Sequence, residues 1–328
     1  MATVCNDRMK RNTWKERRLM IRNIRQERQS ITRNILVIGS GVVGQATGKG
    51  LFCKGHHVVF HDVNPEVLSR LSEEGYETCD DYDLREFDVS MLCVSTPTRD
   101  DKIVLSYLQN AVSKLGVKLA DTSRYHLVVV RCTSLPGTTE ERVIPMLEYY
   151  SRKKAGLDFG VCMNPEFLRS ASAEEDFAHP WLTVIGTYDE RSGEELEKLY
   201  RPFRAEIVVT EIKVAEMMKY VHNLFNATKI SFFNEMHTVC QKLSIDSEAV
   251  NSLVVKSAEG MWNPKYGTVG GRPYGGSCLP KDTRAFRSFA HELNLNHMTL
   301  LDAVIKVNEE MGEQIPSEQL WPVGSLAR

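Results

Sequence analysis

The sequence predicts an α/β protein with an N-terminal doubly wound parallel sheet and an all-α second domain built on one long helix. Three observations predict this architecture. Short apolar segments alternate with helix-like segments over residues 35–209. A glycine-rich turn directly follows the first apolar segment. Residues 211–243 have helical periodicity without an internal Gly or Pro.

The first apolar segment, residues 35–38, is typical of a buried parallel strand. A G-x-G-x-x-G turn follows it, then helix-like sequence to about residue 54 and a second strand over residues 58–61, which ends in Asp62. In this context the motif predicts a Rossmann-type site for a dinucleotide, with the pyrophosphate on the helix N-terminus. Asp62 would accept hydrogen bonds from the adenosine ribose and repel a 2′-phosphate, so the predicted cofactor is NAD. The predicted turn residues are Gly39, Gly41, Val42, Val43 and Gly44.

Three further expected strands, over residues 89–94, 127–130 and 160–163, each end in a polar segment that contains proline. Any one of these segments could be a simple turn. Because ligands bind beyond the carboxyl ends of strands in such a sheet, three of them together favour a ligand cleft. The segments are Ser95-Thr96-Pro97-Thr98, residues 131–138 and residues 164–169, and the last strands are expected at 182–185 and 206–209.

The long helix predicted over residues 211–243 begins the second domain. Lys219 and Asn223 lie four residues apart and so share one helix face, which spacing alone leaves open as a solvated or a functional pair. A helix of this length would expose apolar surface in a monomer, which predicts a homodimer through it. Further helices are expected over residues 246–258, 280–293 and 297–312.

A glycine-rich stretch, residues 270–277, leads into Cys278, and Leu279-Pro280 then starts a helix that has Lys281 and Asp282 in its first turn. A thiol just ahead of a helix N-terminus is favoured as the nucleophilic thiolate. The alternative is a glycine-rich turn beside a small buried cysteine.

The composition narrows the class of protein. The net charge of −2 argues against a wholesale nucleic-acid binder. The eight cysteines include no C-x-x-C pair, so no zinc site or disulfide framework is expected, and a reducing cytoplasm fits best. No apolar run approaches the length of a membrane span.

The basic residues 1–34 predict a solvated extension, with a nucleic-acid or membrane tether as the alternative. The expected domains are therefore 1–34, 35–210 and 211–328.

The motifs together resemble the UDP-glucose/GDP-mannose dehydrogenase family, from about Asn34 to Glu310. The resemblance rests on the glycine turn, the three polar segments, an Ala-Glu-x-x-Lys-Tyr-x-x-Asn helix at residues 215–223 and Gly-Gly-Ser-Cys-Leu-Pro-Lys-Asp at residues 275–282. It implies a Rossmann domain joined by a long helix to an all-α dimerisation domain. It also implies a four-electron oxidation, in which a primary alcohol of a nucleotide sugar becomes a carboxylate while two NAD⁺ are consumed.

The resemblance implies a role for each matching residue. Lys219 and Asp282 would assist removal of the hydroxyl proton, and Cys278 would form a thiohemiacetal and then a thioester. Lys219 and Asn223 would stabilise the oxyanion, and Glu166, helped by Thr133, would activate the hydrolytic water. The cofactor would also contact Ser95, Thr96, Pro97, Thr98, Thr133 and Lys281. The substrate would contact Phe167, Leu168, Arg169, Lys219, Asn223, Tyr274 and Gly275.

Two departures from the family pattern stand out. The position where the family usually has a second glutamate is Ser170, followed by Ala171. Family members also continue with a further Rossmann-like domain for the nucleotide, which we expect to be absent because the sequence stops at Arg328. Two alternative functions remain open at this point: a two-electron hydroxyacid or alcohol dehydrogenase of similar fold, and a non-catalytic NAD-binding remnant.

Overall fold

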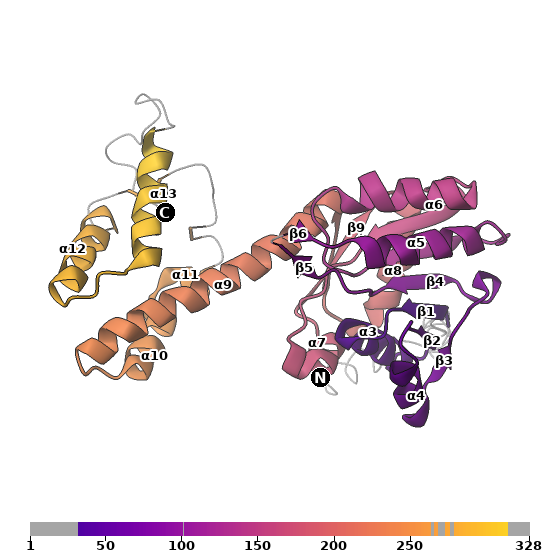
Figure 1. Ribbon diagram of the computed structural model, residues 1–328, viewed down its shortest axis with the longest axis horizontal. Coiled ribbons are helices and arrows are strands. Elements are labelled where there is room, and N and C mark those ends of the chain that lie inside the picture. Colours follow the sequence, from indigo (N-terminus) through magenta and orange to yellow (C-terminus); the bar gives the residue numbers. More distant parts are fainter. Residues whose placement is uncertain (1–31, 101, 264–265, 268–272, 276–278, 314–328) are drawn as a thin grey trace, which may run out of the picture. The chain divides into compact units, whose positions relative to one another are not determined.

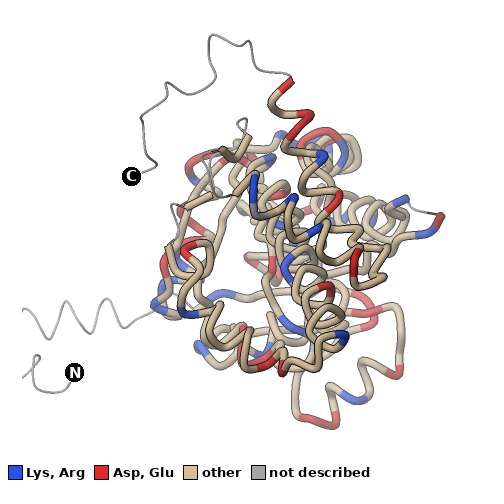
Figure 2. The backbone as a smooth tube through the Cα atoms, turned by 90° about the vertical axis from the view of Figure 1, so that its left-hand side faces the viewer, with Lys and Arg blue, Asp and Glu red and all other residues tan. Residues whose placement is uncertain are grey.

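Figure 1 shows the computed structural model, which describes residues 32–313 except 101, 264–265, 268–272 and 276–278. Of Ser170 and Asp282 only the backbone is described. The chain divides into two compact units, residues 1–221 and 222–328. Acidic and basic residues are interspersed along the described backbone (Figure 2), in keeping with the small net charge.

The first unit is built on a sheet with the strand order β10-β9-β8-β7-β4-β1-β2-β3. Its six strands from β8 to β3 are parallel, and the sequence predicts all of them except β3, while β9 runs antiparallel to β8 and pairs in parallel with β10. The strands are β1 (Asn34–Ile38), β2 (His57–His61), β3 (Glu77–Cys79), β4 (Val89–Leu92), β7 (His126–Val130), β8 (Phe159–Met163), β9 (Leu182–Thr187) and β10 (Glu206–Glu211).

The reversal at β9 follows a link whose helix is short. A connection between two parallel strands must carry the chain back along the full length of a strand, usually through a helix. The link contains the six-residue helix α7 (Ala173–Ala178), about 9 Å long by its rise, which is shorter than the five-residue strand β8 at about 16 Å. The chain therefore re-enters the sheet from the end at which it left. The sequence also failed to predict β3 and a small hairpin of β5 (Thr98–Arg99) and β6 (Lys102–Ile103).

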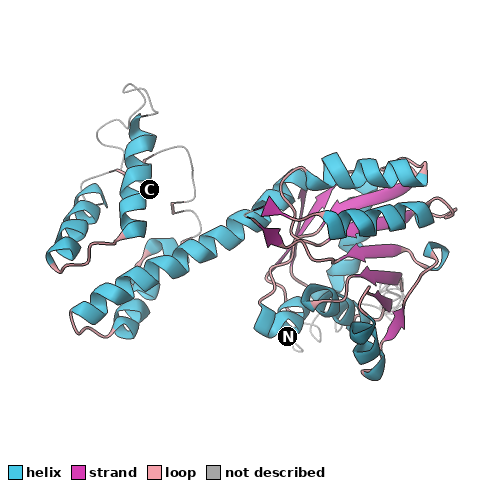
Figure 3. Cartoon of the chain, in the orientation of Figure 1, coloured by secondary structure: helices cyan, strands magenta, loops and turns pink. Residues whose placement is uncertain are grey.

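Helices cover both faces of the sheet (Figure 3), which confirms the doubly wound architecture. Successive side chains of β1 alternate between two cores: Leu36 and Ile38 belong to one, and Ile35 and Val37 to the other. The first core includes α5 (Ser106–Leu119), α6 (Ile144–Ser151) and the start of α9. The second includes α3 (Val42–Cys53), α4 (Pro65–Glu73), α7 and α8 (Glu190–Tyr200).

The second unit is helical, as predicted. The long helix α9 (Ile212–Lys242) contains the point at which the two units divide. Within the second unit it is followed by α10 (Ser247–Ser257), α11 (Glu259–Trp262), α12 (Leu279–Glu292) and α13 (Thr299–Glu313). A small core forms around Val239, Ala290 and Met298, and the Glu235 carboxylate caps α13 by accepting from the Leu300 amide at 2.5 Å. Within the described ranges, no helix is both long and apolar enough to cross a membrane.

Candidate active site

The predicted dinucleotide turn is formed between β1 and α3, and two of its glycines are required by packing. Gly39 has a φ of +91°, and a Cβ on it would lie 2.8 Å from the Cys93 carbonyl carbon. A Cβ on Gly44 would lie 1.9 Å from the Gly39 carbonyl oxygen. At Gly41, by contrast, a Cβ would meet nothing within 4 Å, and no side chain caps the N-terminus of α3. The open side of the turn therefore presents a helix N-terminus, with Val42 and Val43 in its first turn, to an incoming phosphate group.

Asp62 follows β2 beside this turn and is held by two backbone amides. Its Oδ2 accepts from the Ser40 N–H at 2.6 Å, and its Oδ1 accepts from the Asn64 N–H at 2.9 Å. A carboxylate has about four acceptor positions, so two remain for the hydroxyls of a ribose. The negative charge would oppose a 2′-phosphate. The turn and Asp62 thus fit NAD, which would supply a hydride acceptor at the carboxyl edge of the sheet.

The segments after β4 and β7 come together at this edge, as the sequence predicts for polar residues that follow neighbouring parallel strands. The Thr96 hydroxyl donates to the Thr133 carbonyl oxygen at 2.7 Å. Ser95 is exposed, Thr96 and Pro97 are half-buried, and Thr98 begins β5. The hydrogen bond fixes the predicted cofactor segment against the loop that carries Thr133.

An ion pair between Lys219 of α9 and Glu166, which follows β8, is the main feature of the candidate site. The Lys219 Nζ lies 2.7 Å from the Glu166 Oε1 and also donates to the Glu166 carbonyl oxygen. The second carboxylate oxygen, Oε2, accepts from the Leu168 N–H at 2.7 Å. The two charged side chains are 5% and 13% exposed, so the pair is largely shielded from water. The Phe167 ring lies 5.7 Å from the Lys219 ammonium.

Sequence reasoning missed one buried group on the same helix. Glu216 is fully buried, and its carboxylate accepts from the Gly137 N–H at 2.6 Å and the Thr139 N–H at 2.8 Å. Burial raises the pKa of this carboxyl above its ordinary value, and the hydrogen bonds to Thr139 and Gly137 oppose that rise. Thr139 begins a π-helical turn, Thr139–Val143, that leads into α6. The Ala-Glu-x-x-Lys motif was a signal for this role, because it separates Glu216 from Lys219 by one helical turn.

Arg169 and its neighbours lie at the same edge of the first unit. The exposed Arg169 guanidinium forms a two-point ion pair with Asp176 of α7, with Nη2 to Oδ1 at 2.6 Å and Nε to Oδ2 at 3.1 Å. The Asp176 carboxylate also accepts from the Ser172 hydroxyl at 3.1 Å. Phe167 and Leu168 are half-buried between Glu166 and this pair. The loop that was predicted to contact substrate is therefore held at both ends.

The remaining predicted residues belong to the second unit. Asn223 is an exposed residue of α9, and Gly275 is exposed. The Tyr274 N–H donates to the Asn308 Oδ1 of α13 at 2.6 Å. Lys281 and the backbone of Asp282 lie in α12, which begins at Leu279 close to its predicted start. Cys278, the predicted nucleophile, lies outside the described residues, as does the side chain of Asp282.

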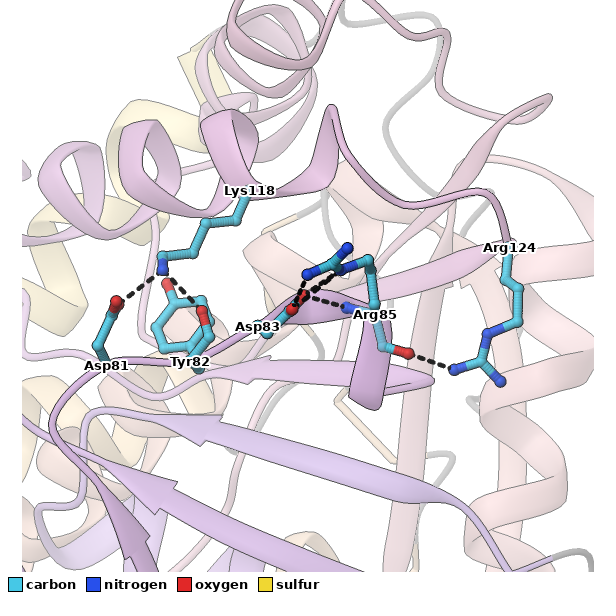
Figure 4. Close-up of polar contacts among 6 residues, drawn as sticks. All are labelled: Asp81, Tyr82, Asp83, Arg85, Lys118 and Arg124. Carbon is cyan, nitrogen blue, oxygen red and sulfur yellow. Dashed lines mark hydrogen bonds and ion pairs between the residues drawn. The ribbon is translucent and has the colours of Figure 1, made fainter.

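A separate hollow of about 770 Å³ lies beside the edge strand β3 and includes the first residues of β1, β2 and β3, which are Asn34, His57 and Glu77. Its charged groups pair with one another (Figure 4): the Lys118 Nζ lies 2.6 Å from both the Asp81 Oδ1 and the Tyr82 carbonyl oxygen. The candidate site, by contrast, follows the last residues of the strands. In the parts of the chain that the structure describes, no group of His, Cys, Asp and Glu is arranged to hold a metal ion.

Comparison with known proteins agrees with this geometry. Residues 69–204 match the NAD-binding domain of the UDP-glucose/GDP-mannose dehydrogenase family, and residues 213–310 match its central domain. GDP-mannose 6-dehydrogenase of Pseudomonas putida is 38% identical over 298 residues, which cover 84% of this chain and 68% of the relative. UDP-glucose 6-dehydrogenase YwqF of Bacillus subtilis is 34% identical over 323 residues, which cover 89% and 70%.

The solved structures give the same result. A ternary complex of GDP-mannose dehydrogenase from Pseudomonas aeruginosa superposes with a TM-score of 0.81 at 33% identity, covering 85% of this chain and 69% of that one. The predicted cofactor, NAD, and the predicted family are confirmed by these matches. The chain therefore belongs to the UDP-glucose/GDP-mannose dehydrogenase family and is an NAD-dependent dehydrogenase that acts on a CH–OH group.

Proposed function

We propose that this enzyme oxidises the primary alcohol of a nucleotide sugar to a carboxylate in two successive NAD-dependent steps, with GDP-mannose as the first substrate to test. The observation that carries the proposal is the buried Lys219–Glu166 pair, which brings a cation and a carboxylate together at the carboxyl edge of the sheet. The relatives that act on GDP-mannose and UDP-glucose support the substrate class.

The proposed reaction consists of two oxidations followed by a hydrolysis. The glycine turn and Asp62 would hold NAD⁺, which would supply the hydride acceptor in each oxidation. Lys219, with Asp282 and a water, assists loss of the hydroxyl proton, and loss of the first hydride together with this proton gives the aldehyde. The Cys278 thiolate adds to the aldehyde carbon to form a thiohemiacetal, whose oxyanion Lys219 and Asn223 stabilise. Loss of the second hydride from this oxyanion leaves a thioester, and water then releases the carboxylic acid and the free thiol.

Glu166 is assigned to the last step. Its Oε1 bonds Lys219 and its Oε2 bonds the Leu168 amide, so the carboxylate is held in one orientation with acceptor positions to spare. A carboxylate held in this way can take a proton from the attacking water. Thr133, in the loop tied to Thr96, would position that water.

A homodimer through α9 is part of the proposal. Several large apolar side chains on α9 are exposed in a single chain, among them Leu224 at 61%, Phe225 at 62% and Ile230 at 62%. A second copy of α9 would cover them. A reducing compartment such as the cytoplasm is also proposed, because the six cysteines among the described residues are free thiols.

The test is the yield of NADH per substrate. Purified full-length chain would be given GDP-mannose, UDP-glucose and simpler nucleosides, each in limiting amount with excess NAD⁺. Two NADH and one carboxylic acid per sugar would support the proposal. One NADH with release of an aldehyde or ketone would indicate a two-electron dehydrogenase. NAD binding without turnover on any of these compounds would indicate the non-catalytic alternative.

A further inference from the structure

A buried cation, Arg131, lies at the end of β7. Arg131 is 4% exposed, and its Nη1 donates to the Asn164 Oδ1 and, at 2.7 Å, to the Tyr200 hydroxyl. Its Cζ lies 5.4 Å from the ring centroid of Phe177, and its Nε has no hydrogen-bond partner. Among the residues that the structure describes, no carboxylate forms an ion pair with it. Burying a charge in this way costs several kcal/mol of stability. A neutral side chain would therefore serve a purely structural role with a smaller loss of stability.

Asn164, the residue that Arg131 holds, is fixed from three directions. Its N–H donates to the Val130 carbonyl oxygen of β7 at 2.8 Å, and its Nδ2 donates to the Val184 carbonyl oxygen of β9 at 2.7 Å. Its Oδ1 accepts from Arg131 and, at 2.6 Å, from the Tyr200 hydroxyl of α8. Asn164 is itself 1% exposed. Asn164 therefore joins β7, β9 and α8 at the point where β8 ends.

The position of Asn164 in turn determines the position of the Glu166 backbone. Only the buried Pro165 separates the two residues, and its ring fixes one of the backbone angles between them. The Glu166 carboxylate then reaches Lys219 and the Leu168 amide. A continuous buried path thus runs from Tyr200 and Arg131 through Asn164 to Glu166 and Lys219.

We propose that Arg131 and Tyr200 are positioning residues, which hold Asn164 and thereby fix Glu166 against Lys219. The inference rests on the proposed function for the role of Glu166 and adds what keeps that carboxylate in place. The positive charge serves this purpose because a charged donor makes a shorter and stronger hydrogen bond than a neutral one. The Phe177 ring lies over the guanidinium, and the burial of Arg131 keeps competing water away from it.

The kinetic test uses Tyr200→Phe, which removes one hydroxyl and keeps the ring. We expect kcat to fall about tenfold, because a small displacement of a reacting group is costly, while the KM values for NAD⁺ and the nucleotide sugar stay unchanged. The matched control is Tyr125→Phe, which removes the hydroxyl that lies 3.0 Å from the Ser192 hydroxyl, also on α8. The fall in kcat should be larger for Arg131→Met than for Tyr200→Phe. Arg131→Lys, which keeps the positive charge, should show a smaller fall in kcat than Arg131→Met.

A second readout needs no turnover. Amide hydrogen exchange would be compared between the wild-type chain and Tyr200→Phe, and we expect residues 164–168 to exchange at least tenfold faster in the variant while residues 126–130 are unchanged. Unchanged exchange over residues 164–168 would overturn the inference, as would an equal fall in kcat in Tyr125→Phe. If the wild-type chain turned over no nucleotide sugar, the proposed function would fail separately, and the exchange result alone would decide this inference.

Discussion

Glu216 and Lys219 lie one turn apart on α9 and bind the loops that follow two neighbouring strands, β7 and β8. Glu216 accepts from the backbone of Gly137 and Thr139, while Lys219 donates to the carboxylate and backbone of Glu166. One end of a helix thereby fixes both loops at the carboxyl edge of the sheet. The proposed catalytic geometry of the first unit depends on these two anchors.

Removing the first anchor should destabilise the fold. In Glu216→Ala two buried amides lose their acceptor, and each unsatisfied donor costs about 1–3 kcal/mol, so we expect the free energy of unfolding to fall by about 2–6 kcal/mol. Urea unfolding measures it. The control is Glu141→Ala on the adjacent π-helical turn, where an exposed ion pair with Lys213 is screened by water and should contribute little to the free energy of unfolding. Equal losses in both variants would contradict the assignment.

Removing the second anchor should abolish catalysis. Lys219→Met leaves the Glu166 carboxylate buried without its cation, which costs about 3–5 kcal/mol in stability, and we expect kcat to fall at least about a hundredfold. Lys213→Met is the control on the same helix, because Lys213 is half-exposed and pairs with Glu141 at 2.9 Å. Steady-state kinetics and urea unfolding check both variants. Full activity in Lys219→Met would show that the ion pair is only structural.

The glycine turn gives a prediction that separates binding from folding. Gly41→Ala adds a methyl group that meets no protein atom within 4 Å, so the melting temperature should stay within about 2 °C of the wild type. The same methyl group would occupy the open side of the turn, and we expect the Kd for NAD to rise at least about tenfold. Calorimetry measures both values. Gly44→Ala should instead lower the melting temperature, because its Cβ would collide with the Gly39 carbonyl oxygen.

A buried histidine should make stability depend on pH. The His126 Nδ1 and Nε2 lie 3.1 Å from the Phe87 carbonyl oxygen and 2.9 Å from the Ser90 hydroxyl, and burial lowers the pKa of His126 from 6.5 to about 4. Because the unfolded chain then binds the proton more tightly, the free energy of unfolding should fall by about 3 kcal/mol as the pH drops from about 6.5 to about 4. Urea unfolding at several pH values measures this slope. His126→Phe should flatten it, and an unchanged slope in that variant would assign the effect elsewhere.

The sequence predicted the parts of the fold that depend on local patterns. The glycine turn, the five parallel strands β1, β2, β4, β7 and β8, and α9 follow from apolar runs, a motif and an uninterrupted helical period. The direction of β9 has no local signature in the sequence, and the very short strands β3, β5 and β6 have too few residues for a pattern to show. These features could not be read from periodicity alone.

The sequence identified candidate residues for the site but did not show which of them contact one another. From spacing and the family resemblance, Lys219 was expected to act with Asn223 and Asp282, and Glu166 with Thr133. The structure joins Lys219 to Glu166 across 53 positions of sequence. Such pairing depends on which loops α9 contacts, and no local spacing encodes it. Arg131 and Glu216 were missed for the same reason, since their main partners lie on other strands and loops.

The most direct test of the account is the covalent intermediate on Cys278. Glu166→Gln, mixed with GDP-mannose and NAD⁺ and quenched in acid, should accumulate a thioester, because oxidation proceeds while hydrolysis is slowed. Intact-mass and peptide mass spectrometry should then find one sugar-nucleotide adduct per chain, on Cys278, and Cys278→Ser should show none. An adduct on another residue, or acid production by the Cys278→Ser variant at the wild-type rate, would contradict the proposed mechanism.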